Sequence, residues 1–422
     1  MLSSTVLALT VLAGQTWTVS SDGRADFSEI GDAIADARVA VGDILLVNPG
    51  EYEGFALDRG LTIVGAAGTQ RPRVEDPVAI TPARFEGEGF AFGFIEFRAS
   101  VVVNGVEGAS RFDNCVMRAD DVLPHGIRVT DCDDVVLSRC NIRGSDADPK
   151  GGKNGGGPAA GHGVISNNSH VTFVDSVSRG GFGQVGPGVP PHAGGHGVVA
   201  QNGTRILMAG GQMLGSPAGG DPNFLKCNLG QGGDGLRLSD SSVDVRGSGA
   251  NDDRILPPPP PPCGPQAFSI RALGPNNDIR FGGPVAVRGV QAPPGTVEVT
   301  TLLQPYLQNN GPGTPGSNNT LRLRGEPNQF ALFFGSNDTT RTEIPDLDLT
   351  LGFDPNSLYF IGAVQTPGVA LAPANCPYDV PNDAPVLDGM ATRFQCVLPN
   401  QPAHGNPVLM TGSNAVDFVL RF

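Results

Sequence analysis

The sequence predicts an all-β chain, in which a parallel β-helix of stacked strand–turn–strand coils is followed by an antiparallel β-sandwich. One observation is a strand opening that occurs four times between Pro124 and Arg246, each copy separated from the next by a Gly-rich loop. A second is composition: 60 Gly and 37 Pro punctuate many short strands, while a hydrophobic content of 39% excludes disorder. A third is the change of pattern after Leu302 to short alternating runs. We therefore expect a β-helix over residues 17–302 and a β-sandwich over 303–422.

Residues 26–38 predict the first element, an amphipathic helix. Asp26 stands where a capping residue would, three residues before Glu29. We expect this helix to cap the N-terminal end of the coil stack, whose first strand would otherwise expose an unpaired backbone edge. The apolar positions at helical spacing are Phe27, Ile30, Ala33, Ile34 and Ala37.

A buried strand, a Pro-Gly turn and two further strands follow between Gly42 and Gly65. With the helix, this stretch resembles the start of right-handed parallel β-helix proteins of the pectin-lyase-like superfamily. The resemblance implies that fold and handedness. It implies no single activity, because the superfamily contains lyases, hydrolases, esterases, epimerases and non-enzymes. The residues that carry it are Phe27, Ile30, Ala33, Ile34, Gly42, Asp43, Ile44, Val47, Pro49, Gly50, Tyr52, Leu61, Ile63 and Gly65.

The central coils open with His125-Gly-Ile-Arg-Val, His162-Gly-Val-Ile-Ser, His196-Gly-Val-Val-Ala and Asp234-Gly-Leu-Arg-Leu, and a weaker fifth copy begins at Gln266. Like positions in neighbouring coils should stack about 4.8 Å apart. The loops between copies leave one corner and should gather on one flank. The predicted inward columns are Ile127, Val164, Val198, Leu236 and Phe268, and Val129, Ala200, Leu238 and Ile270. The predicted loops are Ser145–Gly161, Gly181–Gly195, Ser216–Gly233 and Ser248–Pro265.

The C-terminal region is predicted to form short antiparallel strands. It resembles the small β modules that follow the β-helix in some secreted bacterial proteins. Such a module can cap the coil stack, attach it to a surface or bind a ligand. The predicted strands are Thr320–Arg324, Phe330–Phe334, Asp346–Leu351, Leu358–Val364, Ala391–Val397 and Ala415–Phe422.

Charge and hydropathy restrict the partners and the location. A net charge of −14 argues against nucleic-acid binding and against attraction to an anionic membrane. Residues 4–13 form an apolar run that is too short to span a bilayer, and Val11-Leu12-Ala13 fits a cleavage site. Residues 1–13 therefore predict a signal peptide, and the alternative is a first strand or cap. We expect a secreted or cell-surface protein with no membrane span.

The 7 Cys suit an oxidising compartment and show no zinc-binding spacing. A disulfide between Cys376 and Cys396 is the most plausible, and Cys227 and Cys263 form a second candidate pair. The remaining cysteines lie in the coils. Cys115 and Cys140 should stack on neighbouring coils, either bridged or filling the core, and Cys132 stays unpaired.

The stacked positions His125, His162, His196 and Asp234 are the most conspicuous candidate site. A carboxylate beside an imidazole raises its pKa and makes it a usable proton carrier, so His162, His196 and Asp234 are candidate catalytic residues. Two stacked histidines could also share a metal. The competing interpretation is structural, because a side chain repeated in every coil usually solves a repeated packing problem.

The Gly-His-Gly triplets that begin at Gly161 and Gly195 resemble the triplet in the active site of polygalacturonases. Those enzymes also carry Asn-Thr-Asp and Arg-Ile-Lys, which this sequence lacks. The acidic turn of Asp131, Asp133 and Asp134 is a candidate Ca²⁺ site, and its alternative role is to stabilise the turn through side-chain to backbone bonds.

Basic residues follow the second strand run of three coils. Arg118, Arg143 and Arg179 each end that run, just before a loop. With Lys150 and Lys153 they would form a positive patch that binds a polyanion. Alternatively Asp120, Asp121 and Asp146 neutralise the arginines.

Together these features predict a secreted protein that binds, and can cleave, an extracellular acidic polysaccharide. A lyase or a hydrolase would use the arginines and lysines to hold the sugar carboxylates and a histidine to move the proton. The competing hypothesis is a non-catalytic surface or adhesive rod, because stacking aromatic residues are scarce in the coils. Ca²⁺ is the named candidate cofactor, and the extracellular polysaccharide is the expected partner.

Overall fold

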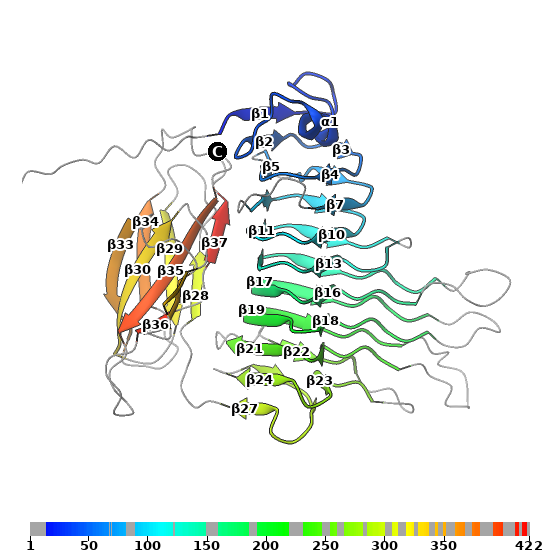
Figure 1. Cartoon of the computed structure of the whole chain (residues 1–422), viewed down its shortest axis with the longest axis vertical. Helices are drawn as coiled ribbons and strands as arrows, with labels where there is room; N and C mark the ends of the chain where they lie inside the picture. Colours follow the sequence, from blue (N-terminus) through cyan, green and yellow to red (C-terminus); the bar gives the residue numbers. More distant parts are fainter. Residues whose placement is uncertain are drawn as a thin grey trace, which may run out of the picture.

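The computed structural model shows a chain that is nearly all β, with long parallel sheets and very little helix (Figure 1). The residues that the structure describes are 14–66, 68, 70–81, 89–120, 123–148, 159–184, 192–218, 231–246, 254–259, 266–281, 285–299, 306–310, 318–324, 328–336, 342–344, 349–351, 359–367, 374–379, 391–399, 410–412 and 416–419. The predicted signal peptide, Lys150, Lys153, Cys227 and Cys263 lie outside them.

One side of the coil stack is a parallel sheet of nine strands within the described ranges. Each coil contributes one strand, and each strand pairs in register with the equivalent strands above and below it. The strands, from the N-terminal end, are β4 (Ala56–Leu57), β7 (Val78–Ile80), β10 (Val101–Asn104), β13 (Ile127–Thr130), β16 (Val164–Asn167), β18 (Val198–Gln201), β20 (Leu236–Ser239), β23 (Ile270–Leu273) and β26 (Val290–Gln291).

The second parallel sheet covers the other two sides of the coil. The two sides are continuous because β17 (His170–Arg179) and β19 (Arg205–Leu214) each pair with strands of both. The other strands of one side are β1 (Thr16–Val19), β2 (Ile44–Val47), β5 (Thr62–Gly65), β8 (Ala91–Gly93), β11 (Ala109–Asp113), β14 (Asp134–Ser138), β21 (Ser242–Arg246), β24 (Asp278–Phe281) and β27 (Val297–Val299). Those of the other side are β3 (Glu51–Tyr52), β6 (Arg73–Val74), β9 (Glu96–Phe97), β12 (Val116–Arg118), β15 (Asn141–Arg143), β22 (Arg254–Leu256) and β25 (Ala286–Val287).

These coils, wound with parallel strands on three sides, are the arrangement expected of a parallel β-helix. The chain bends at Arg139, whose φ is 53°, between β14 and β15, so these two strands lie on two different sides of the coil.

The first predicted inward column is confirmed for four of its five members. Ile127, Val164, Val198 and Leu236 pair in register and are fully buried. The next residue in the column is Ile270, not Phe268, so the fifth copy was aligned two residues too early. Ser269 takes the place of the motif glycine, because a small residue is what the corner between coils requires. In the second column Leu238 accordingly pairs with Ala272.

A short helix, α1 (Ile30–Ala35), lies at the N-terminal end of the stack (Figure 1). Ile30, Ala33 and Ile34 are its buried residues. The predicted cap at Asp26 is wrong: Glu29 is the N-cap, and Asp26 instead accepts hydrogen bonds from the backbone N–H and hydroxyl of Thr18. The proposed function of α1 as a cap stays a prediction.

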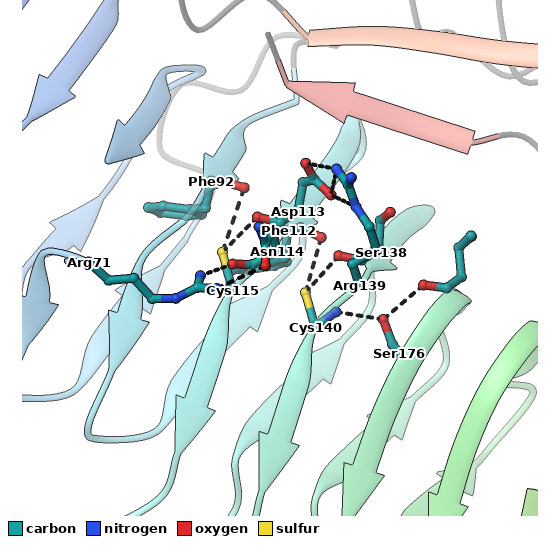
Figure 2. A network of polar contacts seen from close by, with 11 residues as sticks. Arg71, Phe92, Phe112, Asp113, Asn114, Cys115, Ser138, Arg139, Cys140 and Ser176 are labelled. Atoms are coloured by element: carbon teal, nitrogen blue, oxygen red, sulfur yellow. Dashed lines mark hydrogen bonds and ion pairs between the residues drawn. The ribbon is translucent and has the colours of Figure 1, made fainter. Parts of the chain in front are cut away.

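The coil cysteines are free thiols packed in the core. Cys115 and Cys140 precede the paired residues Val116 and Asn141, and both are buried, so the predicted stacking is confirmed. Figure 2 shows each thiol donating to backbone carbonyl oxygens, with 3.2 Å from Cys140 Sγ to the oxygen of Phe112. The predicted Cys376–Cys396 bridge is wrong, because no disulfide joins these two described cysteines in the structure.

The C-terminal strands form antiparallel sheets that pack beside the coil stack, on the side away from the nine-stranded sheet (Figure 1). Their core is continuous with Val174 and Ala209, which project outward from β17 and β19. The predicted sandwich and its boundary at residue 303 stay predictions. The strands described are β28 (Tyr306–Asn310), β29 (Asn318–Arg324), β30 (Phe330–Ser336), β31 (Thr342–Ile344), β32 (Leu349–Leu351), β33 (Tyr359–Gln365), β34 (Ala374–Asp379), β35 (Ala391–Pro399), β36 (Met410–Gly412) and β37 (Val416–Val419).

Candidate functional site

The structure stacks the predicted histidine column at the corner where the loops meet the nine-stranded sheet. The ring centroids of His125 and His162 are 5.1 Å apart, and those of His162 and His196 are 4.8 Å apart. Each Nδ1 accepts a hydrogen bond from the backbone N–H at the same position of the next coil. The bonds run from His162 N to His125 (3.2 Å), from His196 N to His162 (3.0 Å) and from Asp234 N to His196 (2.7 Å). We call this series the histidine ladder.

Asp234 is the last member of the ladder, and its acceptor is a buried carboxylate instead of an imidazole nitrogen. Its Oδ1 accepts the backbone N–H of Phe268 at 2.8 Å, and its Oδ2 accepts Nε of Arg271 at 2.8 Å. The carboxylate is completely buried, whereas the Arg271 side chain is 17% exposed. Asp234 Oδ2 also lies 3.6 Å from Nδ1 of His196, which is too long for a strong hydrogen bond.

The ladder fixes the protonation of the rings. A neutral imidazole has one N–H and one acceptor nitrogen, so an accepting Nδ1 places the hydrogen on Nε2. Burial lowers the pKa of His196 to about 4, although Asp234 acts in the opposite direction. Burial also lowers the pKa of His162 to about 2 and that of His125 to about 4. Asp234 does raise the pKa of His196, as expected, but desolvation outweighs the carboxylate, so the pKa of this imidazole lies below its usual value.

The glycines that flank the histidines explain the Gly-His-Gly triplets sterically. The two ends of successive loops interleave: Gly181 N donates to the Gly161 oxygen at 2.8 Å, and Gly195 N donates to the Gly181 oxygen at 2.9 Å. A Cβ on Gly195 would overlap the Gly161 carbonyl oxygen, and one on Gly163 would overlap the oxygen of the Ser178 side chain. The resemblance to the polygalacturonase triplet thus has a packing cause in this chain.

Two outward rows on the nine-stranded sheet were not singled out from the sequence. One row is cationic and aliphatic, and the other carries amides and hydroxyls beside it. The alternation of inward and outward residues in the motif Gly-Ile-Arg-Val was the signal that could have revealed them. The first row is Val102, Arg128, Ile165, Val199, Arg237 and Arg271. The second is Asn104, Thr130, Asn167, Gln201, Ser239 and Leu273.

A cavity of about 290 Å³ lies where these rows meet the histidine ladder. His162, His196 and Arg237 line it, and Gln201 and Ser239 supply further polar groups. Nη1 of Arg237 is 3.2 Å from Nε2 of His196. The cavity therefore combines a permanent cation with hydrogen-bonding groups suited to a polar, anionic ligand.

The predicted arginine column forms as expected in register: Arg118 pairs with Arg143, and Arg143 with Arg179. Arg143 binds Asp146 at 2.9 Å and stacks over the ring of Phe182, so the neutralising interpretation holds for this arginine. Arg118 reaches Glu96 only at 4.0 Å, and its side chain is 63% exposed. The column belongs to the sheet formed by β12, β15 and β17, not to the nine-stranded sheet that bears the cavity. Its role in substrate binding stays a prediction.

The acidic turn offers the Ca²⁺ hypothesis no support. Among the residues that the structure describes, no three His, Cys, Asp or Glu side chains converge as metal ligands. Asp131 has a φ of 51° and accepts a hydrogen bond from the Asn168 amide at 2.7 Å. Asp134 is the first residue of β14. Asp131 therefore stabilises the turn between coils.

The ladder predicts acid sensitivity. An unfolded histidine titrates near pH 6.5, so below that pH the unfolded chain binds a proton that folded His162 does not. This contribution to stability is complete above pH 6.5 and is lost as the pH falls towards 2. At pH 5 the contribution of His162 to the free energy of unfolding is about 2 kcal/mol smaller than above pH 6.5. Urea unfolding at pH 8 and pH 5 measures it. His162→Asn keeps an acceptor for the ladder but does not titrate, so its loss over this range should be smaller by that amount. An equal loss in both proteins would contradict the prediction.

The fold and the corner site define a coil-stacked β protein with a polar cavity on one parallel sheet. No model of a known protein family matches the chain. No curated protein matches it either. Across the described ranges, no helix combines the length and apolar character needed to cross a membrane.

Among solved structures, the chain is similar to the full-length tailspike protein 2 of an Escherichia coli O157:H7 bacteriophage. The TM-score is 0.31 and the identity 11%, over 97% of this chain and 64% of that one. It is also similar to the enzymatically active domain of tailspike protein 2 of bacteriophage CBA120. There the TM-score is 0.27 and the identity 12%, over 90% of this chain and 66% of that one. The chain thus spans just under two thirds of the length of each, and function has to be inferred from its own side chains.

Proposed function

We propose that this protein binds an acidic polysaccharide along the outer face of the nine-stranded sheet, beside the loop corner. The observation that carries the proposal is the cavity in which Arg237 contacts the edge of the histidine ladder, and which the amide of Gln201 and the hydroxyl of Ser239 also line. A guanidinium group pairs with carboxylates, and amides and hydroxyls form hydrogen bonds with sugar hydroxyls.

The rows on either side of the cavity support an extended ligand rather than a small one. Asn104, Thr130 and Asn167 continue the polar row towards the N-terminal end, and Arg128 is exposed in the cationic row. Neighbouring coils are about 4.8 Å apart, so like side chains recur at a regular spacing along the stack. A polymer that repeats polar groups along its length fits such a surface. The C-terminal module packs on a different side of the coils.

The histidine ladder favours binding over cleavage. To act as a general base, Nε2 of His162 or His196 would have to lose its hydrogen, and Nδ1 would then point an N–H at the donor of the next coil. Cleavage with His162, His196 and Asp234 as the catalytic residues stays a prediction. The proposal includes export, because residues 4–13 have the character of a signal peptide and acidic polysaccharides are extracellular polymers.

A glycan panel tests the proposal. We expect binding to immobilised polygalacturonate and alginate but not to neutral glucans, with an affinity that falls as salt is added. Arg128→Glu should weaken binding to polygalacturonate at least about tenfold, because it reverses a charge on the binding face. Arg24→Glu is the matched control, since Arg24 is 88% exposed and lies near the first coil, away from the cavity.

Equal binding to charged and neutral glycans, or equal losses in the two variants, would overturn the proposal. Ultraviolet absorbance of unsaturated products and release of reducing ends, measured on the same glycans, separate a lyase and a hydrolase from a binding protein.

A further inference from the structure

The cavity contains two hydrogen-bond donors that face each other. Nε2 of His196 carries a hydrogen, because Nδ1 accepts the backbone N–H of Asp234 at 2.7 Å. Nη1 of Arg237 is always a donor, and it lies 3.2 Å from that Nε2. The two groups cannot satisfy each other while the ladder bond is intact. An acceptor that takes a hydrogen bond from both would remove the conflict.

Among the residues that the structure describes, no carboxylate supplies that acceptor. Arg237 forms no ion pair with a described carboxylate, whereas Arg271, its neighbour in the row, is held by Asp234. On the other side Arg237 pairs with Val199, an aliphatic residue. His196 is buried except for 8% of its surface, and it lines the cavity together with Arg237. The two donors, 3.2 Å apart, thus belong to side chains that both line the cavity.

We propose that Arg237 and His196 form a binding site for one carboxylate group, which accepts hydrogen bonds from Arg237 Nη1 and His196 Nε2. A planar carboxylate has two oxygens, so it can take one bond from each donor. The Gln201 amide and the Ser239 hydroxyl lie in the same cavity and can bind the remaining lone pairs. A free carboxylate ion and a uronate unit of a glycan present the same group. The glycan source rests on the proposed function, whereas the donor pair does not.

The test uses sodium acetate and a trigalacturonate, each titrated into ¹⁵N-histidine-labelled protein at constant ionic strength. There are 6 histidines in the chain, so the spectrum is simple. We expect a saturable shift of the His196 Nε2 resonance with acetate, while the Nδ1 resonance stays that of an acceptor. The trigalacturonate should bind the same site more tightly, because it also contacts the polar row.

Two variants each remove one of the two hydrogen-bond donors. His196→Asn keeps an acceptor for Asp234 N but lacks the second donor, and Arg237→Gln changes an outward residue. Each should weaken acetate binding at least about tenfold, measured by thermal stabilisation. Arg24→Gln is the matched control and should bind acetate as the parent protein does. Should His196→Asn fail to fold, Arg237→Gln alone decides.

The outcomes distinguish this inference from the proposed function. Unchanged acetate binding in Arg237→Gln, or an unchanged His196 resonance, overturns the carboxylate site. Binding of trigalacturonate that is indifferent to both variants overturns the site and leaves glycan binding intact. Binding of acetate but not of trigalacturonate or polygalacturonate supports the site and removes the proposed function.

Discussion

Gly195→Ala is expected to lower the free energy of unfolding by about 3 kcal/mol or more. An alanine Cβ at this position would overlap the carbonyl oxygen of Gly161 and would lie 2.8 Å from the backbone nitrogen of Gly181. Every atom that it meets belongs to the backbone, so no side chain can rotate away. The coils would have to separate at the corner, which would stretch the bond from Gly195 N to the Gly181 oxygen.

The measurement is urea unfolding at pH 8, with the transition followed by circular dichroism. Gly31→Ala is the matched control. Gly31 lies in α1, where the nearest atom to an added Cβ is Phe55 Cβ at 3.7 Å, and alanine favours a helix more than glycine does. We expect that control to be neutral or stabilising. A Gly195→Ala protein within 1 kcal/mol of the parent would show that the corner is looser than the structure indicates.

Much of the fold could be predicted because stacking imposes its own repeat. The motif that begins at His125, His162, His196 and Asp234 placed four coils in the correct register. The fifth copy was misaligned, because Gln266-Ala looked like the motif opening. The structure shows that what matters at that position is a small residue, and Ser269 meets the requirement.

The site was predicted only in outline, for a physical reason. Sequence repetition shows that the histidines stack, but not which ring nitrogen faces the next coil, and that atom decides between a proton carrier and a backbone acceptor. Arg237 could have been found, since strand alternation points it outward from β20. The contact between Arg237 and His196 could not be predicted, because loop lengths and the twist of the coils set the distance between their side chains.

Asp234→Ala is expected to cost about 3–5 kcal/mol of stability, the range for removing one partner of a buried ion pair. Two groups lose their acceptor at once: the Phe268 N–H, bound at 2.8 Å, and the Arg271 guanidinium, whose Nε is also bound at 2.8 Å. Asp234 is fully buried, so water cannot replace the carboxylate without entering the corner. Asp234→Asn should cost less, since an amide oxygen still accepts the backbone N–H.

A double variant separates the ion pair from the ladder. Asp234→Ala combined with Arg271→Met removes both charges, so we expect it to recover part of the loss, and the Phe268 N–H left without its acceptor accounts for the remainder. Urea unfolding of the parent protein, the two single variants Asp234→Ala and Arg271→Met, and the double variant gives the coupling energy between the two side chains. If the double variant were no more stable than Asp234→Ala, the stranded charge of Arg271 would not be the main cost. The end of the histidine ladder would then depend chiefly on the backbone hydrogen bond, which has its counterparts at His125 and His162.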